Sequence, residues 1–350
     1  MRTRLGTLSR RDAIQLLGIA LWPASVGAQA RKEGGAIVRT LLADLPPDAL
    51  GAGPVLFHEH LSNIWPIGSA SSFTDDVDLM IEETRSAGKD GVRCIVDAGH
   101  PDMGRKIDAL RRIANESGVH IVASGGYYMQ RTYPEKITTQ TADQIADELV
   151  REARQQRLGA IGEIGQQGGV MTGDEKKVFE AVGKVQARTG LPILTHNAYT
   201  GMRQTITPVP RETALRQLDV LESAGATPAH IAIGHVCCLN DPKAELAQQI
   251  AKRGAYVGFD RATIPLVPDA QKVTTILAMV DAGYIEQVLI SSDFYHENSL
   301  KKKGGGGVGQ AVTVFAPLLV KAGLTADRLN QILVDNPRRF LAFVPRTDAS

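Results

Sequence analysis

The chain has 350 residues, of which 43% are hydrophobic and 22% are charged, and these values are ordinary for a soluble globular protein. Its formal net charge is only +1 and its positive charges are dispersed, so the basic face that a nucleic-acid partner requires is missing. Beyond the first thirty residues, no stretch is apolar for long enough to span a membrane. These properties exclude nucleic-acid-binding and integral membrane proteins as the expected classes.

The first thirty residues have the three parts of a secretory signal. Arg10 and Arg11 precede a short apolar stretch from Ile14 to Val26, and Ala28-Gln29-Ala30 provides a small-x-small cleavage site. Adjacent arginines are typical of the twin-arginine route, which exports folded proteins. We therefore expect residues 1–30 to be a signal peptide, residues 31–350 to be the mature domain, and the protein to be periplasmic. The alternative is an uncleaved amphipathic N-terminus.

The mature chain alternates short apolar runs with amphipathic helical stretches. Eight of the runs are almost continuously hydrophobic, as strands buried on both faces are. The runs span residues 55–60, 94–99, 121–128, 160–165, 192–197, 231–236, 255–260 and 288–293. Helices are expected between them, for example at 140–156, 174–188, 211–224 and 241–253. This rhythm predicts an α/β fold consisting of a single (β/α)8 TIM barrel.

Metal-ligand side chains stand at the ends of several predicted strands, where the loops of such barrels collect the chemistry. The first strand carries His58 and His60, whose spacing points both to one face, while Glu59 between them is expected to be structural. The remaining ones are Glu163 on the fourth strand, His196 on the fifth, His235 on the sixth and Asp293 on the eighth. One such residue alone is more often a satisfied core polar group. Six at one end of a barrel predict a metal site.

These residues stand in motifs that resemble the phosphotriesterase family of the amidohydrolase superfamily, and within it the branch of phosphotriesterase homology proteins and lactonases. The motifs are His58-Glu59-His60-Leu61, Ile161-Gly162-Glu163-Ile164-Gly165, Leu194-Thr195-His196, Ile233-Gly234-His235 and Ser292-Asp293. The resemblance covers nearly the whole mature chain, which makes it much stronger than an isolated His-x-His motif.

The resemblance implies two divalent metal ions at the C-terminal ends of the strands, with zinc as the expected element. It implies that His58, His60 and Asp293 bind the more buried ion, and that His196 and His235 bind the more exposed one. Most family members bridge the ions with a carboxylated lysine, and Glu163 stands at that position here. A glutamate keeps an anionic bridge on a shorter arm and removes the dependence on carbon dioxide.

A binuclear site predicts hydrolysis without a serine or cysteine nucleophile. Two ions roughly 3.5–4 Å apart share a hydroxide that attacks a carbonyl or phosphoryl centre. Asp293 is the expected catalytic residue, because it stands beside that nucleophile and can take its proton. We expect a small-molecule substrate with an ester, lactone or organophosphate-like bond. Carboxylic esters and lactones are favoured, since only 5% of the residues are aromatic.

Three further residues are expected to contact the substrate. Tyr128 and Arg261 match positions near the metals in the lactonases that the chain resembles. His296 lies in the loop after the eighth predicted strand, together with the four-glycine run Gly304–Gly307. That run is interpreted either as a plain mobile loop or as a closing lid.

Other functions remain open from the sequence alone. One alternative is the hydrolysis of a C–N bond, as in amidases of the same superfamily, and another is a non-catalytic periplasmic protein that binds a metal or a ligand. The complete ligand set argues against the binder, because binding does not need a proton-accepting aspartate. The resemblance also suggests a homodimer, although no interface can be identified from the sequence.

Overall fold

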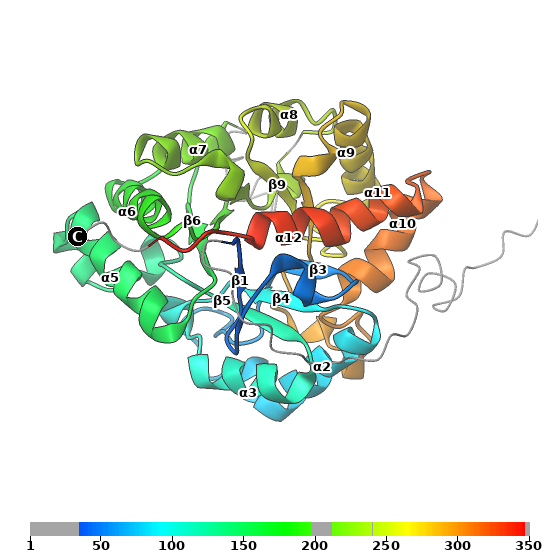
Figure 1. The fold of residues 1–350 in the computed structure, drawn as a ribbon, viewed down its shortest axis with the longest axis horizontal. Coiled ribbons are helices and arrows are strands. Elements are labelled where there is room, and N and C mark those ends of the chain that lie inside the picture. Colours follow the sequence, from blue (N-terminus) through cyan, green and yellow to red (C-terminus); the bar gives the residue numbers. More distant parts are fainter. Residues whose placement is uncertain (1–34, 198–211, 240, 347–350) are drawn as a thin grey trace, which may run out of the picture.

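The computed structural model describes residues 35–197, 212–239 and 241–346. The signal peptide expected at 1–30 and the first residue of the helix expected at 211–224 lie outside this part of the chain. Eight parallel strands, β3 to β10, form one sheet in chain order, and the sheet curves into a nearly closed barrel surrounded by helices (Figure 1). The expected (β/α)8 architecture is confirmed.

The elements alternate regularly along the described chain. The barrel strands are β3 (Val55–Glu59), β4 (Cys94–Asp97), β5 (His120–Gly125), β6 (Ala160–Gly165), β7 (Ile193–His196), β8 (Ile231–Ile233), β9 (Tyr256–Phe259) and β10 (Val288–Ile290). The helices are α2 (Val77–Lys89), α3 (Ile107–Ser117), α4 (Lys136–Thr139), α5 (Ala142–Gln156), α6 (Gly173–Thr189), α7 (Thr213–Ser223), α8 (Glu245–Lys252), α9 (Asp269–Asp281), α10 (Ala316–Lys321), α11 (Ala326–Asn330) and α12 (Asn336–Leu341). A two-stranded antiparallel ribbon, β1 (Val38–Arg39) and β2 (Asp44–Leu45), precedes the barrel.

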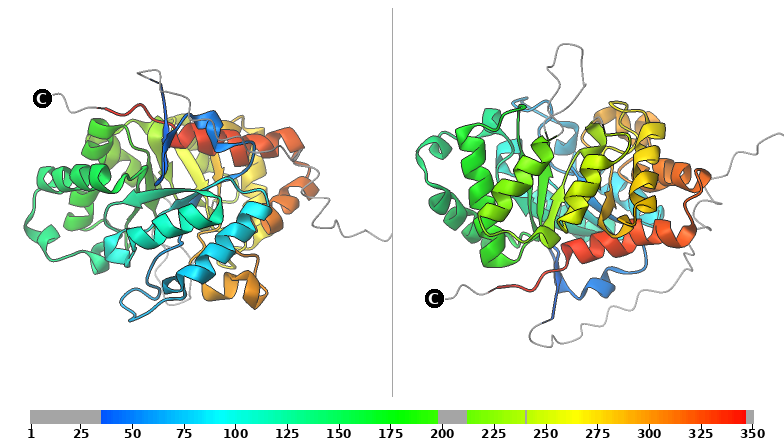
Figure 2. Two further views of the ribbon diagram at one scale, coloured as in Figure 1. Left: turned by 60° about the horizontal axis from the view of Figure 1, so that its bottom comes forward. Right: turned by 90° about the horizontal axis from the view of Figure 1, so that it is seen from above.

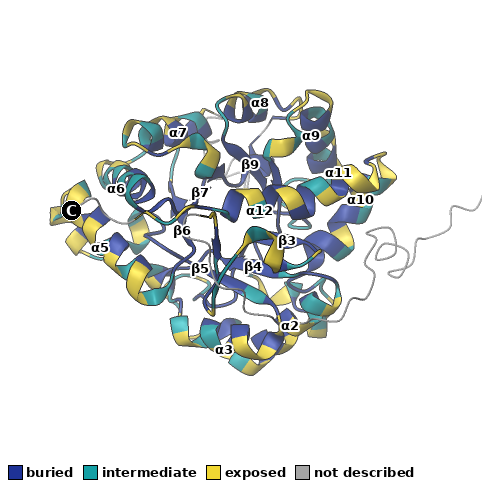
Figure 3. Cartoon of the chain, viewed as in Figure 1, coloured by how far each residue is buried: buried dark blue, intermediate teal, exposed yellow. Residues whose placement is uncertain are grey.

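Buried apolar side chains fill the barrel on both sides of its wall, while the outer faces of the helices are exposed (Figure 3). Apart from His120 at the start of β5, every residue of the barrel strands is buried, which explains their continuous hydrophobic runs. At the N-terminal end, α12 lies across the barrel (Figures 1 and 2). Its Phe340 ring packs edge-on against Phe57 and Tyr256, with ring centroids 6.3 Å and 5.3 Å away. The end opposite the expected site is therefore a closed apolar core.

Seven of the eight barrel strands end one to three residues earlier than the hydrophobic pattern predicts, and β6 ends where it predicts. β10 stops at Ile290 rather than at residue 293, and β8 stops at Ile233 rather than at residue 236. The residues that follow, among them His235 and Asp293, leave the hydrogen-bonded ladder. Hydrophobicity alone does not mark this change, because these residues stay buried after the strand has ended.

The glycine-rich loop after β10 packs along the outside of α2. The backbone N–H of Lys301 donates to Glu83 Oε1 at 2.8 Å, and the Lys301 ammonium pairs with Asp90. The N–H of Gly307 donates to Ser299 O at 2.7 Å, which closes the loop on itself. This anchoring does not support the lid interpretation of Gly304–Gly307.

None of the helices in the described part of the chain combines the length and the apolar character that crossing a bilayer would require.

Candidate metal centre

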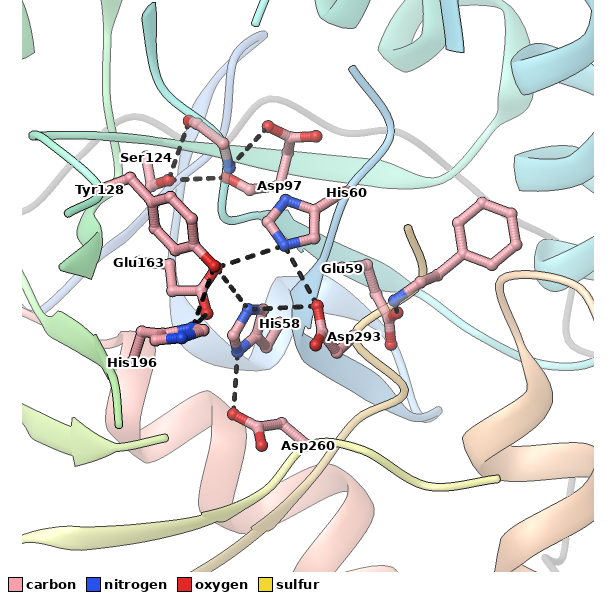
Figure 4. Close-up of polar contacts among 12 residues, drawn as sticks. His58, Glu59, His60, Asp97, Ser124, Tyr128, Glu163, His196, Asp260 and Asp293 are labelled. Carbon is pink, nitrogen blue, oxygen red and sulfur yellow. Dashed lines mark hydrogen bonds and ion pairs between the residues drawn. The ribbon is translucent and has the colours of Figure 1, made fainter. Parts of the chain in front are cut away.

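The structure brings the six expected metal ligands together at the C-terminal end of the barrel. They come from β3 and the residue after it, from β6 and β7, and from the loops after β8 and β10 (Figure 4). Each of them is at most 3% exposed, so none is left to water. They are His58, His60, Glu163, His196, His235 and Asp293.

Irregularities in two strands turn ligands into the barrel. Val55 and Phe57 belong to the apolar cluster inside the barrel, so strict alternation would turn His58 outward. The pairing of β3 with β4 shifts its register between Leu56 and Glu59, and His58 points inward as well. Register shifts of this kind re-aim side chains next to active sites.

A register shift also positions Glu163, the expected bridging carboxylate, on β6. Ile161 and Ile164 both pack in the outer core, and the pairing with β7 shifts its register between them. Gly162 lies within the shift with a φ of 119°, which only glycine adopts without strain. A Cβ on Gly162 would lie 2.0 Å from Leu194 O, so the two strands approach each other too closely there for any side chain. The result is that Glu163 faces the histidines.

Glu163 lies at the centre of the four histidines. Its Oε1 is 2.7 Å from His235 Nε2 and forms a short contact with His196 Nδ1. Its Oε2 is 3.5 Å from both His58 Nε2 and His60 Nε2. One carboxylate thus lies close to all four rings, which fits a ligand shared by two ions. Asp293 completes the group, with its Oδ1 3.2 Å from His60 Nε2 and 3.8 Å from His58 Nε2.

Asp260, just beyond β9, holds two of the histidines from behind. Its Oδ2 accepts the Nδ1–H of His58 at 2.9 Å, and its Oδ1 accepts the Nδ1–H of His235 at the same distance. The backbone N–H of His235 donates to Oδ1 as well. A carboxylate in this place fixes the ring orientation and the tautomer, leaving both Nε2 atoms directed at the site. It is fully buried.

Two candidate ligands have backbones in the left-handed region. His235 has a φ of 55° and Asp293 a φ of 49°. Such conformations cost free energy in residues other than glycine and persist at functional sites where surrounding contacts enforce them. For Asp293 those contacts are the hydrogen bond from its N–H to His58 O at 3.2 Å and the hydrogen bonds that Glu59 accepts from the residues on either side of Asp293. Glu59 Oε1 and Oε2 accept the N–H groups of Ser292 and Phe294 at 2.8 Å and 2.7 Å, which gives Glu59 the structural role expected for it.

The electrostatics of the site favour positive charge between the carboxylates. Burial lowers the pKa of His58, but Glu163 and Asp260 outweigh this effect and raise it well above the ordinary value. Burial likewise lowers the pKa of His60, whereas Asp293 and Glu163 raise it to about 9. For His235, burial and Arg261 lower the pKa, yet Asp260 and Glu163 bring it to about 9. Burial keeps His196 neutral, with its pKa lowered to about 4.

The acids of the site stay ionised despite their burial. Burial would raise the pKa of Glu163, but His196 and His58 hold it well below the usual range. Burial would also raise the pKa of Asp293, and the guanidinium of Arg261 together with His60 lowers it instead. The Arg261 Nε–H donates to Asp293 Oδ2 at 2.9 Å. Asp293 is therefore an ionised acceptor that a cation holds in place.

The residues present fit divalent metal ions. Two groups have ligand atoms that all lie within 4.8 Å of one another, namely His58, His60 and Asp293, and His58, Glu163 and His235. The Nε2 atom of His58, shared by both groups, is buried without a hydrogen-bond partner among the described residues. Imidazole and carboxylate donors suit zinc and similar ions. His196 belongs to neither group, so the grouping differs from the expected pairing of His196 with His235.

A small cavity with a free volume of about 10 Å³, room for about one water molecule, opens beside these ligands. Its wall consists of His60, Asn63, Trp65, Met103, Tyr128, Glu163, Arg261, Asp293 and Tyr295. Tyr128, whose hydroxyl lies 3.3 Å from His196 Nδ1, and Arg261 are thus placed where substrate contacts were expected. His296 is exposed, does not line this cavity and accepts the N–H of Asn298 through its ring. The neighbouring Tyr295 takes the place expected for His296, because the chain turns outward after it.

Sequence reasoning missed Asp260, Asn63, Trp65 and Tyr295 as parts of the site. Asp260 carried a detectable signal, since it directly follows a barrel strand as the ligands do. Asn63 and Trp65 stand three and five residues after His60, in a loop whose path no hydrophobic pattern predicts. For these two residues only the folded chain reveals the role.

Comparison with known proteins agrees with this geometry. The model of the phosphotriesterase family matches residues 38–341. The phosphotriesterase homology protein of Escherichia coli is 30% identical over 82% of this chain and 97% of its own. Its crystal structure, with phosphate in the active site, superimposes with a TM-score of 0.75 at 28% identity and covers 83% of this chain and 99% of that one.

A second relative is the N-acetyltaurine hydrolase of Danio rerio, 26% identical over 87% of this chain and 98% of its own. The family match spans the whole barrel and every candidate ligand, from His58 to Asp293. The chain therefore belongs to the phosphotriesterase family of metal-dependent hydrolases.

Proposed function

We propose that this protein is a binuclear metal-dependent hydrolase of small carboxylic acyl compounds. The observation that carries the proposal is the position of Glu163, whose two oxygens lie close to four histidines. The ionised carboxylate of Asp293 lies next to one of them, His60. A protein that only binds a metal needs neither an open cavity beside the ligands nor a proton acceptor lining it.

The chain supplies binding, orientation and proton transfer. His58, His60, His196, His235, Glu163 and Asp293 would hold the ions, and zinc is the proposed element. Two such ions, when bound, lower the pKa of a water molecule and polarise the substrate oxygen. Asp293 lines the cavity and is held ionised by Arg261, so its carboxylate can take the proton of the attacking water and deliver it to the leaving group.

Tyr128 and Arg261 are proposed to orient the substrate. Both side chains are buried and line the cavity. Tyr128 places a hydroxyl beside His196, and Arg261 places a cation beside Asp293. Donors fixed in this way act on the developing oxyanion without reorganisation, which is the main source of electrostatic stabilisation in enzymes.

The size of the cavity favours small acyl compounds over phosphotriesters with bulky aromatic groups. Its free volume of about 10 Å³ lies far below the roughly 300 Å³ at which pockets for drug-sized ligands begin. Esters and lactones are one candidate class. Amides are a second, because a relative of similar length is named as a hydrolase of N-acetyltaurine, an amide.

The proposal is tested by metal analysis together with a substrate screen. Purified protein loaded with Zn²⁺ should retain about two ions per chain after desalting, and it should hydrolyse at least one carboxylic ester, lactone or amide faster than the metal-free protein. One ion per chain that is unaffected by Glu163→Ala would contradict the bridged site. Loaded protein that turns over phosphotriesters and no acyl compound would contradict the proposed substrate class.

We also propose export to the periplasm through the expected signal peptide. Fractionation of cells that express the full chain, compared with an Arg10→Lys, Arg11→Lys double variant, tests this route. Retention of only the double variant in the cytoplasm is the expected result.

A further inference from the structure

Lys272 is a buried lysine that has no part in the proposed chemistry. It lies in the first turn of α9, one of the outer helices (Figure 1), and its side chain is only 1% exposed. Its ammonium donates to Arg261 O at 2.6 Å, to Ile264 O at 2.8 Å and to Asp269 Oδ1 at 2.8 Å. These three acceptors take all the donors of the group. Lys272 therefore ties α9 to the turn that begins at Arg261, just after β9.

This turn has a backbone conformation that its surroundings must enforce. Thr263 has a φ of 70°, which costs free energy for a residue other than glycine. Its N–H donates to Asp269 Oδ1 at 3.2 Å, and the N–H of Ala262 donates to Ser291 O at 3.1 Å. The chain that follows Arg261 is thus fixed to α9 on one side and to the end of β10 on the other.

Stability alone does not explain a lysine at this position. Burial of an ammonium costs free energy even when it is paired, and an apolar side chain of similar length avoids that cost. The acceptors also have other donors, since Arg261 O accepts the N–H of Ile264 at 3.2 Å and Ile264 O accepts the N–H of Leu266 at 2.9 Å. The Asp269 side chain is 26% exposed and so reaches water. Loss of the ammonium therefore leaves each acceptor with a partner and removes a link between α9 and the turn.

We propose that Lys272 is a positioning residue, which fixes the backbone of Arg261 and so holds its guanidinium against Asp293. The Arg261 Nε–H donates to Asp293 Oδ2 at 2.9 Å, and both side chains line the cavity. Lys272 is not among the described residues that line it, so its effect on the reaction passes through Arg261. A displacement of about 1 Å among reacting groups lowers a rate by up to about 100-fold. This inference rests on the proposed function, in which Asp293 accepts the proton and Arg261 orients the substrate.

Lys272→Met tests this role, because methionine has a similar length and no donor. In the Zn²⁺-loaded enzyme it should lower kcat on the preferred acyl substrate by about 10- to 100-fold and change KM by less than about threefold. Metal content should stay that of the wild type, since Lys272 donates to none of the candidate ligands. A fall in kcat that a loss of metal accounts for would contradict the proposal.

A double-mutant cycle separates an action through Arg261 from a general loosening of the fold. Arg261→Met alone should lower kcat at least as much as Lys272→Met does. The double variant should then be no slower than Arg261→Met, because two residues that act through one contact do not have additive effects. Losses that multiply in the double variant would show that Lys272 acts on turnover without Arg261, and they would overturn the proposal.

Lys177 provides a matched control far from this turn in the sequence. Like Lys272, it donates to two backbone carbonyls, Ile137 O at 2.5 Å and Thr138 O at 3.4 Å, and it pairs with the aspartate one helical turn before it, Asp174. None of these residues lines the cavity. Lys177→Met should therefore leave kcat unchanged. An equal fall in kcat in both lysine variants would mean that any such lysine matters, and the special role of Lys272 would be refuted.

Hydrogen exchange tests the inference apart from turnover. Exchange of the amides of residues 262–264 reports how often the turn opens. Loss of the charged hydrogen bonds in Lys272→Met should speed this exchange by about 10- to 100-fold, in metal-free and in Zn²⁺-loaded protein. Lys177→Met should leave it unchanged and speed exchange at residues 137–140 instead.

The exchange measurement also distinguishes the two proposals. If the wild type hydrolyses no acyl compound, the proposed function fails, and the exchange of residues 262–264 still decides whether Lys272 holds the turn. Exchange that is the same in the wild type and in Lys272→Met would refute the positioning role, whatever the enzyme hydrolyses.

Discussion

Asp260 contacts two candidate ligands, His58 on β3 and His235 in the loop after β8, so one side chain orients both rings. Its two oxygens accept the Nδ1–H groups of His58 and His235, so both rings must present Nε2 to the cavity. Burial would raise the pKa of Asp260, but these two histidines hold it below the ordinary range, so the group stays ionised. A side chain with only one acceptor oxygen cannot hold both rings.

Asp260→Asn should therefore lower the affinity for metal. The amide nitrogen of the new side chain opposes one ring N–H, so one histidine loses its fixed orientation, and losses of this kind weaken metal binding by about 10- to 100-fold. Metal retained after dialysis against a graded chelator measures the effect. Asp241→Asn is the matched control, because Asp241 is an equally buried aspartate that accepts backbone N–H groups at the start of α8. It should lower stability and leave the metal content unchanged.

Asp293→Asn should separate proton transfer from metal binding. Asparagine keeps the shape and one acceptor oxygen but cannot take a proton, so kcat should fall by about 10²- to 10⁴-fold, the usual contribution of general acid–base catalysis. Metal content, measured on the same samples, should fall by a smaller factor. A variant with unchanged kcat on the preferred acyl substrate would show that the proton goes elsewhere.

At the scale of elements, the register shifts in β3 and β6 decide which side chains face the mouth. Both shifts directly precede or enclose a candidate ligand, His58 in one case and Glu163 in the other. The strand β6 depends on Gly162, where a Cβ would meet the carbonyl of Leu194. The geometry of the site is thus built into the sheet, not only into the loops.

Gly162→Ala should consequently impair both stability and metal binding. The positive φ costs about 1–3 kcal/mol for a residue other than glycine, and the clash with Leu194 O pushes β6 away from β7 at a further cost of about 1–3 kcal/mol. Chemical denaturation and metal analysis measure the two effects. Gly173→Ala, at the open start of α6 where a Cβ meets nothing within 4 Å, should be neutral or slightly stabilising. Equal behaviour of the two variants would contradict this account of β6.

The sequence could predict the barrel and the types of ligand, because burial on both faces and the ends of parallel strands leave direct patterns. It could not predict the direction of each ligand. Simple alternation places His58 and His60 on one face correctly, but it does not reveal that a register shift turns that face inward. His296, which was expected to contact the substrate, does not line the cavity, because the chain turns outward after Tyr295.

At the scale of the whole molecule, the candidate ligands connect strands from the first to the last of the barrel. β3 and β10 are the two ends of the sheet, and His58 O accepts the N–H of Asp293 where they meet. Ions held by residues from both ends of the sheet would link the junction of β3 and β10 to β6, β7 and β8. Binding that favours only the folded state adds to its stability by mass action.

Removal of metal should lower the melting temperature. At a free concentration of 100 times Kd, a bound ion contributes about 2.7 kcal/mol. At roughly 2–4 °C for each kcal/mol in a large domain, calorimetry should show a loss of about 5–10 °C after chelation. The Asp260→Asn variant should lose less at the same metal concentration, because it binds the metal more weakly. An identical melting temperature with and without chelator would show that the ions do not join the strands.

The meeting of Glu59 with the backbone around Asp293 also has a consequence for biosynthesis. The hydrogen bond from Phe294 to Glu59 joins residues 235 positions apart. A nascent chain that still lacks its last barrel strand therefore has no Asp293 and no grip on it, however well its first half has collapsed. We therefore expect the metal centre to form only after the last barrel strand has folded. A ribosome-bound or truncated product should stay unmetallated.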